Sequence, residues 1–298
     1  MVAVVPTTGS TAPTGVVAQR KSRTGYLLLF PGMAWLAVFF AIPFVTLFMT
    51  SLQEPIPGSS GKYQPAFNVG NYVEAFTEYW DVYIRSFVYA GIATALALAI
   101  AYPLAYFIAF KAGRWRSLML VLVIAPSFAS FLLRTYAWKT ILADEGIITS
   151  TLNALHLLPD DRILNTGIAV VAGLTYNFLP FMILPLYAAL EKIDPRLIEA
   201  ASDLYASPQT AFRKVTWPLS MPGVVAGTLL TFIPAAGDYI NAELLGSTGN
   251  RMIGNAIQTN FIEFRDYPIA SALSFMLMAI ILVLVFTYIR RAGTEDLV

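Results

Sequence analysis

Residues 86–110, SFVYAGIATALALAIAYPLAYFIAF, decide the class of fold. These 25 residues contain no Asp, Glu, Lys or Arg, and a helix of about 20 apolar residues is long enough to cross the hydrocarbon core of a bilayer. Pro103 would break a helix in water, but in a membrane bundle the neighbouring helices satisfy the carbonyl that it frees. The stretch therefore predicts a membrane-spanning helix.

Five other stretches share this length and apolar character. The expected spans, in chain order, are residues 26–50, 86–110, 117–138, 167–190, 219–240 and 268–289. Over the 298-residue chain, 57% of residues are hydrophobic and 12% are charged, whereas a soluble domain has roughly 25% charged residues. One globule of this size cannot hide so much apolar surface. We therefore predict an all-α, multi-pass protein of the cell membrane with six transmembrane helices.

The charge balance and the rare residues exclude several functions. The net charge is +1, so nucleic acid is not an expected partner. The chain has no Cys and a single His, His156, which excludes disulfides, iron–sulfur clusters and zinc sites built from Cys or from several His. We expect no metal site and interpret His156 as a surface residue. A pore, a transporter or a membrane enzyme that works with carboxylates remains.

The distribution of Lys and Arg sets the expected orientation. With the N-terminus in the cytoplasm, twelve basic residues fall on the cytoplasmic side and six on the other side, and cytoplasmic loops carry the excess in membrane proteins. We therefore expect both termini in the cytoplasm and the acidic loops 51–85 and 139–166 outside. The expected domains are a disordered cytoplasmic tail at 1–24, a transmembrane domain at 25–291 and a cytoplasmic C-terminal tail at 292–298.

One segment between the fourth and fifth spans is more than a connector. It is EKIDPRLIEAASDLYASPQTAFRKVTWPLSMPGV, residues 191–224. Asp194 followed by proline predicts the cap and first residue of a short amphipathic helix over 195–206. Ser207, also followed by proline, predicts a second helix that ends before Pro218. Two such helices could fit a groove of another protein, or could lie on the headgroups of membrane lipids.

This segment carries a family resemblance. Glu-Ala-Ala at 199–201, with residues 215–218 at the right distance, resembles the EAA loop of permease subunits from binding-protein-dependent ABC importers. The family pattern has Gly where this chain has Tyr205, and Leu where it has Trp217. Because Tyr adopts a positive φ only at a cost, we expect the turn between the two helices at 206–207.

The resemblance implies a coupling loop at 191–217, between helices 4 and 5, that docks on an ATPase. The residues that it marks for this role are Glu199, Ala200, Ala201, Asp203, Tyr205 and Pro218. A solvated charge on the helix surface is the alternative for Glu199. Beyond the loop, the resemblance covers residues 20–291 and is closest to the spermidine/putrescine permeases, through residues 217–246, 252–261 and 266–274.

The resemblance further implies a pore-forming, non-enzymatic subunit with no catalytic residue. The expected partners are two ATP-binding subunits, a second permease subunit that is expected to be a homologue, and an extracytoplasmic substrate-binding protein. Residues 58–63, GSSGKY, have the wrong spacing for a phosphate-binding loop. We therefore expect this chain to bind no cofactor, with ATP and Mg on the partner ATPase.

Four residues are candidates for the substrate pathway. Asp238 and Tyr239, near the outer end of the fifth span, offer the carboxylate and aromatic face that an ammonium group needs; alternatively, Asp238 reaches water among the headgroups. Tyr176 and Asn177, inside the fourth span, are weaker candidates because packing and interhelical hydrogen bonding also explain them.

The sequence leaves three alternatives to a polyamine importer. An importer of the same class could carry another small solute, because relatives share much of the scaffold. An ion-coupled secondary transporter would need carboxylates deep in the bilayer and usually an internal repeat, and the sequence has neither. A membrane enzyme would need paired intramembrane carboxylates or a nucleophile with a base, which the sequence does not offer.

Overall fold

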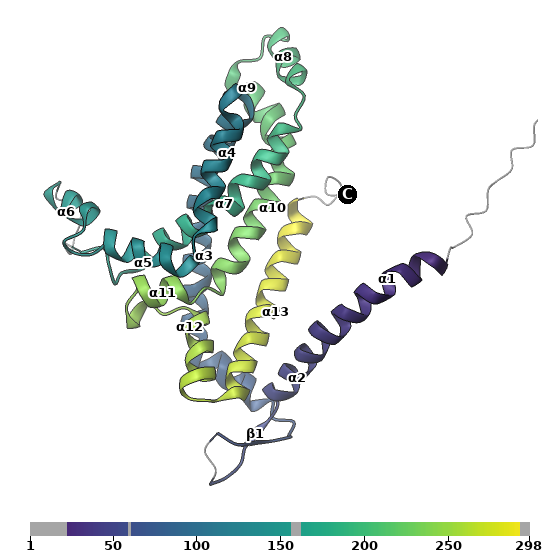
Figure 1. Cartoon of the computed structure of the whole chain (residues 1–298), viewed down its shortest axis with the longest axis vertical. Coiled ribbons are helices and arrows are strands. Elements are labelled where there is room, and N and C mark those ends of the chain that lie inside the picture. The colour runs from purple at the N-terminus through teal and green to yellow at the C-terminus, as the bar shows by residue number, and fades with distance from the viewer. Residues whose placement is uncertain (1–22, 59–60, 156–161, 293–298) are drawn as a thin grey trace, which may run out of the picture. The chain divides into compact units, whose positions relative to one another are not determined.

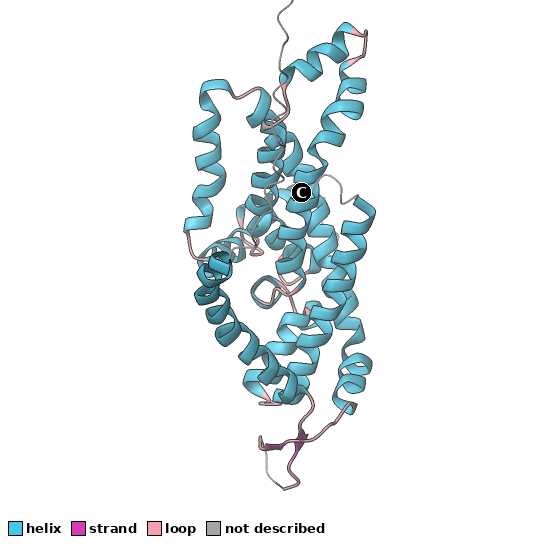
Figure 2. Ribbon diagram, turned by 90° about the vertical axis from the view of Figure 1, so that its right-hand side faces the viewer, coloured by secondary structure: helices cyan, strands magenta, loops and turns pink. Residues whose placement is uncertain are grey.

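The computed structural model describes residues 23–58, 61–155 and 162–292. His156, residues 1–22 of the expected N-terminal tail and residues 293–298 of the expected C-terminal tail lie outside the described residues. The chain divides into two compact units, Met1–Thr46 and Leu47–Val298. Helices dominate the described residues of both units (Figures 1 and 2).

The described residues of the first unit belong to one long apolar helix. They form α1 (Arg23–Leu36), a wider π turn η1 (Ala37–Ala41) and the start of α2 (Ile42–Ser51). The π turn ends two residues before Pro43, whose ring and missing N–H disturb regular α-helical bonding. Residues 29–51 are long and apolar enough to cross a membrane, which agrees with the expected span at 26–50.

Four long helices form the core of the second unit: α3 (Gly70–Phe110), α7 (Gly167–Glu191), α10 (Trp217–Ala236) and α13 (Tyr267–Ala292). Helix α3 packs against α7, α10 and α13, and α7 packs against α10 (Figure 1). The bounds of α7 and α13 confirm the fourth and sixth expected spans to within three residues. In the described residues, five helices could cross a membrane, or six if one bent pair counts as a span.

Small residues let these helices approach closely. The inner face of α3 is a row of fully buried alanines, Ala90, Ala93, Ala97, Ala101 and Ala105. On α10, two glycines four residues apart face α7, and a Cβ added at the first would lie 2.5 Å from the Cβ of Ala189. In a membrane, where apolar residues gain little by leaving lipid, such close backbone packing holds helices together.

The second span is longer than expected. We expected a helix at 86–110 and an outer loop at 51–85, but α3 begins at Gly70. Its first four turns carry acidic residues, which lower the hydropathy of this segment, so the sequence did not indicate that it belongs to the helix. They are helical because they pack: Ala75 and Tyr83 are buried, and the Tyr83 hydroxyl donates to the carbonyl of Leu273 on α13 over 2.8 Å.

The third span is not the straight helix expected at 117–138. After a short 3-10 turn, η2 (Gly113–Trp115), the chain forms α4 (Arg116–Ile124) and a second 3-10 turn, η3 (Ala125–Phe128). It then bends by 94° into α5 (Phe131–Ile141). Pro126 disturbs the hydrogen bonding of the helix, and the two residues after η3 are extended, with ψ of 146° and 137°.

The fifth span also ends early. Helix α10 ends at Ala236 instead of the expected residue 240, and a separate short helix, α11 (Ile240–Leu245), follows. The remaining elements are short: α6 (Ile147–Ala154), η5 (Thr248–Asn250), α12 (Ile253–Gln258) and the π turn η6 (Thr259–Glu263). An antiparallel pair of two-residue strands, β1 (Glu54–Pro55) and β2 (Tyr63–Gln64), is a small exception to the all-α prediction (Figure 2).

Candidate functional sites: the 191–217 loop and a buried polar cluster

The caps of the 191–217 loop confirm the sequence prediction. Helix α8 (Pro195–Asp203) begins after Asp194, whose carboxylate accepts the Arg196 N–H over 3.0 Å. Helix α9 (Pro208–Ala211) begins after Ser207, whose hydroxyl accepts the Thr210 N–H over 3.3 Å. These bonds satisfy backbone donors that have no partner inside the helix.

The turn between the two helices is made by Tyr205, and the expected turn at 206–207 is wrong. Tyr205 has a φ of +60°. Its N–H donates to Ser202 O over 2.9 Å, and the Ala206 N–H donates to Ala201 O over 3.0 Å. These two bonds form a Schellman motif, which requires a left-handed residue directly after the last helical turn. Tyr205 therefore has the left-handed conformation that is more common for glycine at this position of the motif.

The second helix does not end before Pro218, contrary to the prediction. Helix α9 continues through a π turn, η4 (Phe212–Thr216), directly into α10, so that Pro208–Ala236 is one helical segment of 29 residues. The Trp217 N–H donates to the Phe212 carbonyl, five residues back. This wider turn comes just before Pro218, which has no N–H to continue regular α-helical bonding.

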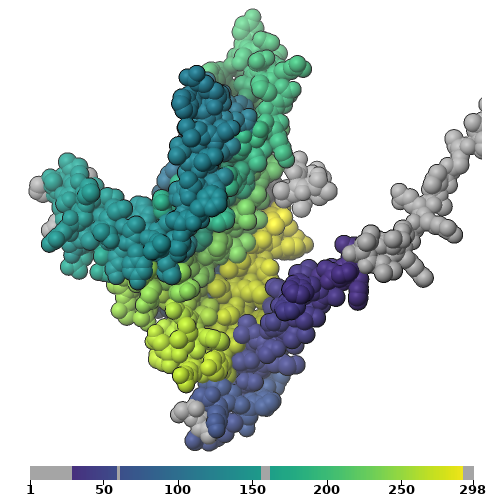
Figure 3. All heavy atoms as spheres, in the orientation of Figure 1, coloured from purple at the N-terminus to yellow at the C-terminus, as the bar shows by residue number. Residues whose placement is uncertain are grey.

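The loop presents α8 to the exterior of the unit. None of its nine residues is buried, and it lies at one end of the unit, beyond α9 (Figure 3). The predicted coupling residues Glu199, Ala200, Asp203, Tyr205 and Pro218 are exposed, and Ala201 is half-buried. Leu204 and Tyr205 are 82% and 99% exposed, so the turn offers apolar surface beside the acidic helix.

The predicted pathway residues differ in burial. Asp238 lies between α10 and α11 and is buried, whereas the adjacent Tyr239 is 41% exposed. The two adjacent side chains thus differ in exposure, and their joint role toward an ammonium group stays a prediction. Tyr176 is half-buried, with its ring centroid 5.3 Å from that of Trp138 on α5.

Asn177 and Asp238 belong to one buried polar cluster. The Asn177 amide on α7 donates to the side-chain oxygens of Asn241 on α11 over 3.0 Å and of Thr135 on α5 over 3.2 Å. The Asn241 N–H donates to Asp238 Oδ1 over 2.8 Å. The cluster therefore joins the bent third span to α7 and to the connection after α10.

Sequence reasoning missed Asn241 and Thr135. The approach of Asn241 to α7 depends on Gly173, since a Cβ there would lie 2.7 Å from the Asn241 Oδ1 atom and 2.4 Å from the side chain of Leu245. Asn177 Oδ1 and Asn241 Nδ2 are buried without hydrogen-bond partners among the described residues. The cluster thus has spare hydrogen-bonding capacity. The sequence did offer one signal. Polar side chains within or next to apolar spans cost free energy in a membrane, and they therefore mark candidate functional residues.

Fold and sites together define a multi-span membrane protein with an exposed helical loop, and the comparisons name its family. The family described as "Binding-protein-dependent transport system inner membrane component" matches residues 12–292, and the chain belongs to this family of inner-membrane transport proteins.

Two similar relatives share a description. The chain is 39% identical over 259 residues to the "Spermidine/putrescine transport system permease protein PotB" of Haemophilus influenzae. This match covers 86% of this chain and 90% of the relative. It is 36% identical over 262 residues to the protein of the same description from Escherichia coli K12, with 87% of this chain and 94% of the relative covered.

A solved structure has a similar fold. A chain of a bacterial ABC transporter involved in the import of the acidic polysaccharide alginate matches with a TM-score of 0.66 at 18% identity. The match covers 92% of this chain and 96% of the other. At this identity the likeness supports the fold alone.

Proposed function

We propose that this chain is the pore-forming permease subunit of an ATP-driven importer of polyamines, spermidine or putrescine. The observation that carries the proposal is the identity of 36–39% to two spermidine/putrescine transport system permeases, over at least 86% of this chain and 90% of each relative. Family membership gives the transport role, and these relatives give the substrate class.

The loop at 191–217 is the surface on which an ATP-binding subunit docks in this proposal. It is the EAA-type loop between the fourth and fifth spans, and its support is structural: α8 is capped at its start, closed by a Schellman turn at its end and unburied along its length. A rigid, exposed helix can transmit a movement to α10, because α9, η4 and α10 form one helical segment. ATP and Mg bind to the two partner ATPases, not to this chain.

The proposed assembly needs further subunits and a defined orientation. With the bent pair counted as one span, six transmembrane helices would put both termini and the coupling loop on the same side of the membrane. The excess of Lys and Arg on that side supports a cytoplasmic location. A second permease, homologous or identical, completes the pathway. An extracytoplasmic binding protein delivers the solute; a structural neighbour of this chain was solved with a periplasmic protein that carries alginate pentasaccharide.

The buried polar cluster marks the proposed substrate pathway, with Asp238 as the carboxylate that a cationic solute needs. Asn177 supports it through Asn241, while Tyr176 and Tyr239 contribute aromatic faces nearby in the sequence. Because Asp238 is buried within one chain, a solute would reach it only when the spans move during the transport cycle.

Uptake by cells tests the proposal. The chain is expressed with its ATPase, binding-protein and permease partners in cells that lack polyamine import, and uptake of labelled spermidine and putrescine is compared with uptake of labelled amino acids. We expect ATP-dependent uptake of at least one polyamine. Uptake of another solute but of neither polyamine would refute the substrate class, and polyamine uptake without the ATPase would refute the mechanism.

A further inference from the structure

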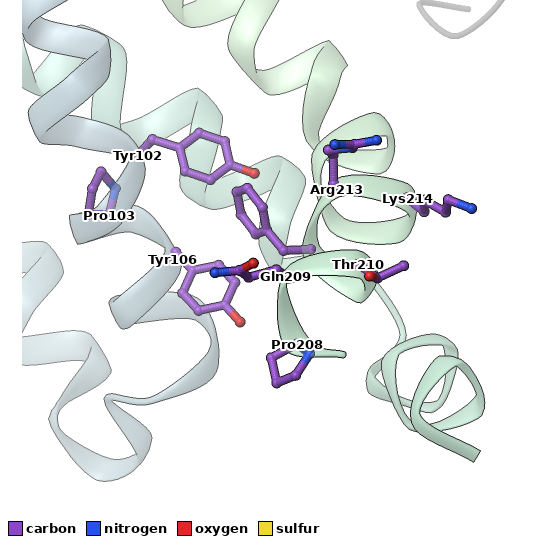
Figure 4. Close-up of a pocket in the computed structure, with 9 residues that line it drawn as sticks. Tyr102, Pro103, Tyr106, Pro208, Gln209, Thr210, Arg213 and Lys214 are labelled. Atoms are coloured by element: carbon purple, nitrogen blue, oxygen red, sulfur yellow. The ribbon is translucent and has the colours of Figure 1, made fainter. Parts of the chain in front are cut away.

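A cavity of about 910 Å³ lies between α3 and the start of the α9–α10 segment (Figure 4). Its apolar wall is aromatic: the ring centroid of Phe212 lies 5.7 Å from that of Tyr102 and 6.2 Å from that of Tyr106. The volume lies within the range of about 300–1,000 Å³ that is typical of small-ligand sites. The cavity is therefore large enough for a ligand with a polar head.

Polar and cationic residues also line the cavity. Arg213 and Lys214 line it together with Gln209 and Thr210 (Figure 4), and none of the residues that line it is acidic. Both cations are exposed, and neither forms a salt bridge within the described part of the chain. Two unpaired cations repel a cationic solute and attract an anion, so the cavity is not suited to the proposed cargo.

The location favours a lipid. Trp217 packs beside the cavity, with its ring centroid 5.2 Å from that of Tyr102, and Tyr and Trp concentrate where membrane meets water. Under the orientation of the proposed function, on which this step rests, the cavity opens at the cytoplasmic side. The cytoplasmic leaflet carries the anionic lipids of the membrane, and basic pockets between helices on this side bind their headgroups.

We propose that this cavity binds the headgroup of an anionic phospholipid of the cytoplasmic leaflet. The lipid phosphate pairs with Arg213 and Lys214, and the glycerol region lies over the rings of Tyr102, Tyr106 and Phe212. The acyl chains continue along the exposed outer face of α3. A bound lipid would thus join α3 to the second helix of the 191–217 loop, within the segment that also carries the predicted docking helix α8.

Lipid retention by the purified full-length chain tests this site. Native mass spectrometry compares bound phosphatidylglycerol with bound phosphatidylcholine of the same acyl chains, supplied in equal amounts. We expect the wild type to retain at least five times more phosphatidylglycerol, and the double variant R213Q/K214Q to bring the ratio below two. Both replaced side chains are exposed, so an unchanged thermal unfolding midpoint in lipid-free detergent will show that the variant folds.

A matched variant controls for total charge. K111Q/R114Q removes two exposed cations at the same end of the bundle but outside the cavity, and should keep the wild-type ratio. Q209E, which adds a carboxylate to the cavity, should lower the ratio without loss of a cation. Equal retention of the two lipids by the wild type would overturn the proposal, as would an equal fall in K111Q/R114Q and R213Q/K214Q.

Two competitors separate the lipid from other occupants. Displacement of phosphatidylglycerol by inorganic phosphate at the same concentration would refute a lipid site in favour of a free anion. Displacement by the purified ATP-binding subunit would refute it in favour of a protein interface. Because retention is measured on the isolated chain, failure of polyamine uptake would refute only the proposed function. Absence of the lipid preference in the wild type, with normal uptake, would refute only the lipid site.

Discussion

The contact between α7 and α10 makes a quantitative prediction, because Gly223 leaves no room for a methyl group. A Cβ built at this position would lie 2.5 Å from the Cβ of Ala189, 2.8 Å from the carbonyl oxygen of Pro185 and 3.1 Å from the Cα of Leu186. Carbon atoms in contact prefer a separation of about 3.5–4.0 Å. In Gly223→Ala the two helices must therefore move apart by about 1 Å, and they cannot relax by rotating a side chain.

Two opposing effects set the size of the change. Overpacking a close interface costs about 1–3 kcal/mol, whereas Ala in place of Gly inside a helix gains roughly 0.5–1 kcal/mol. Because the crowding atoms are backbone and Cβ atoms, the first effect dominates, and we expect Gly223→Ala to lower the free energy of unfolding by about 1–2 kcal/mol. Gly91→Ala is the matched control, since a Cβ at Gly91 on α3 would meet nothing within 4 Å.

The assay is reversible unfolding of the full-length chain in mixed micelles of a mild detergent and dodecyl sulfate, followed by circular dichroism. Gly91→Ala should be as stable as the wild type or more stable by up to about 1 kcal/mol, and Gly223→Ala clearly less stable. If both variants have the same free energy of unfolding, close backbone contact does not hold α7 against α10 and the argument fails.

Four further predictions concern the candidate sites. Glu199→Lys should reduce co-purification of the ATP-binding subunit without affecting membrane insertion, whereas Glu145→Lys should not; normal co-purification and solute-stimulated hydrolysis in Glu199→Lys would exclude the docking role. A single Cys at Asp203 should resist a membrane-impermeant thiol reagent in intact cells, and labelling from outside would reverse the proposed orientation. Asp238→Asn keeps an oxygen that can accept the backbone N–H but removes the charge, so polyamine uptake should fall several-fold at unchanged expression; wild-type uptake would remove Asp238 from the pathway. Tyr205→Asn, which tolerates a left-handed backbone better, should slow amide hydrogen exchange in the turn several-fold, and faster exchange would contradict the assigned strain.

What could be predicted from the sequence was decided by local chemistry. The caps at Asp194 and Ser207 depend on one side chain and on backbone donors two or three residues away, so the residues themselves contain the information. The fourth and sixth spans contain no charged residue over their expected length, and the bilayer requirement alone predicts them. In both cases, no contact from a distant part of the chain is needed to fix the outcome.

The wrong predictions have different causes. A polar segment became the start of α3 because Tyr83 reaches α13, 190 residues further along the chain. The turn stayed at Tyr205 because two backbone bonds close it there, and because a side chain that is 99% exposed meets no steric obstacle beyond its own backbone. Intrinsic preference argued against Tyr at this position, but the cost of one left-handed residue, roughly 1–2 kcal/mol, is small enough for the surrounding structure to override.

The polar cluster depends on a contact that no local pattern contains. Helix α10 ends at Ala236, and the next residues, Gly237 and Asp238, lie against the start of α12: a Cβ at Gly254 would be 2.4 Å from the Gly237 carbonyl oxygen and 2.9 Å from that of Asp238. Only glycine at 254 permits this approach. Because the backbone is held there, the carboxylate of Asp238 meets the N–H of Asn241 and is buried with it. A larger residue at 254 would therefore disturb the carboxylate of Asp238 by displacing the backbone of residues 237 and 238.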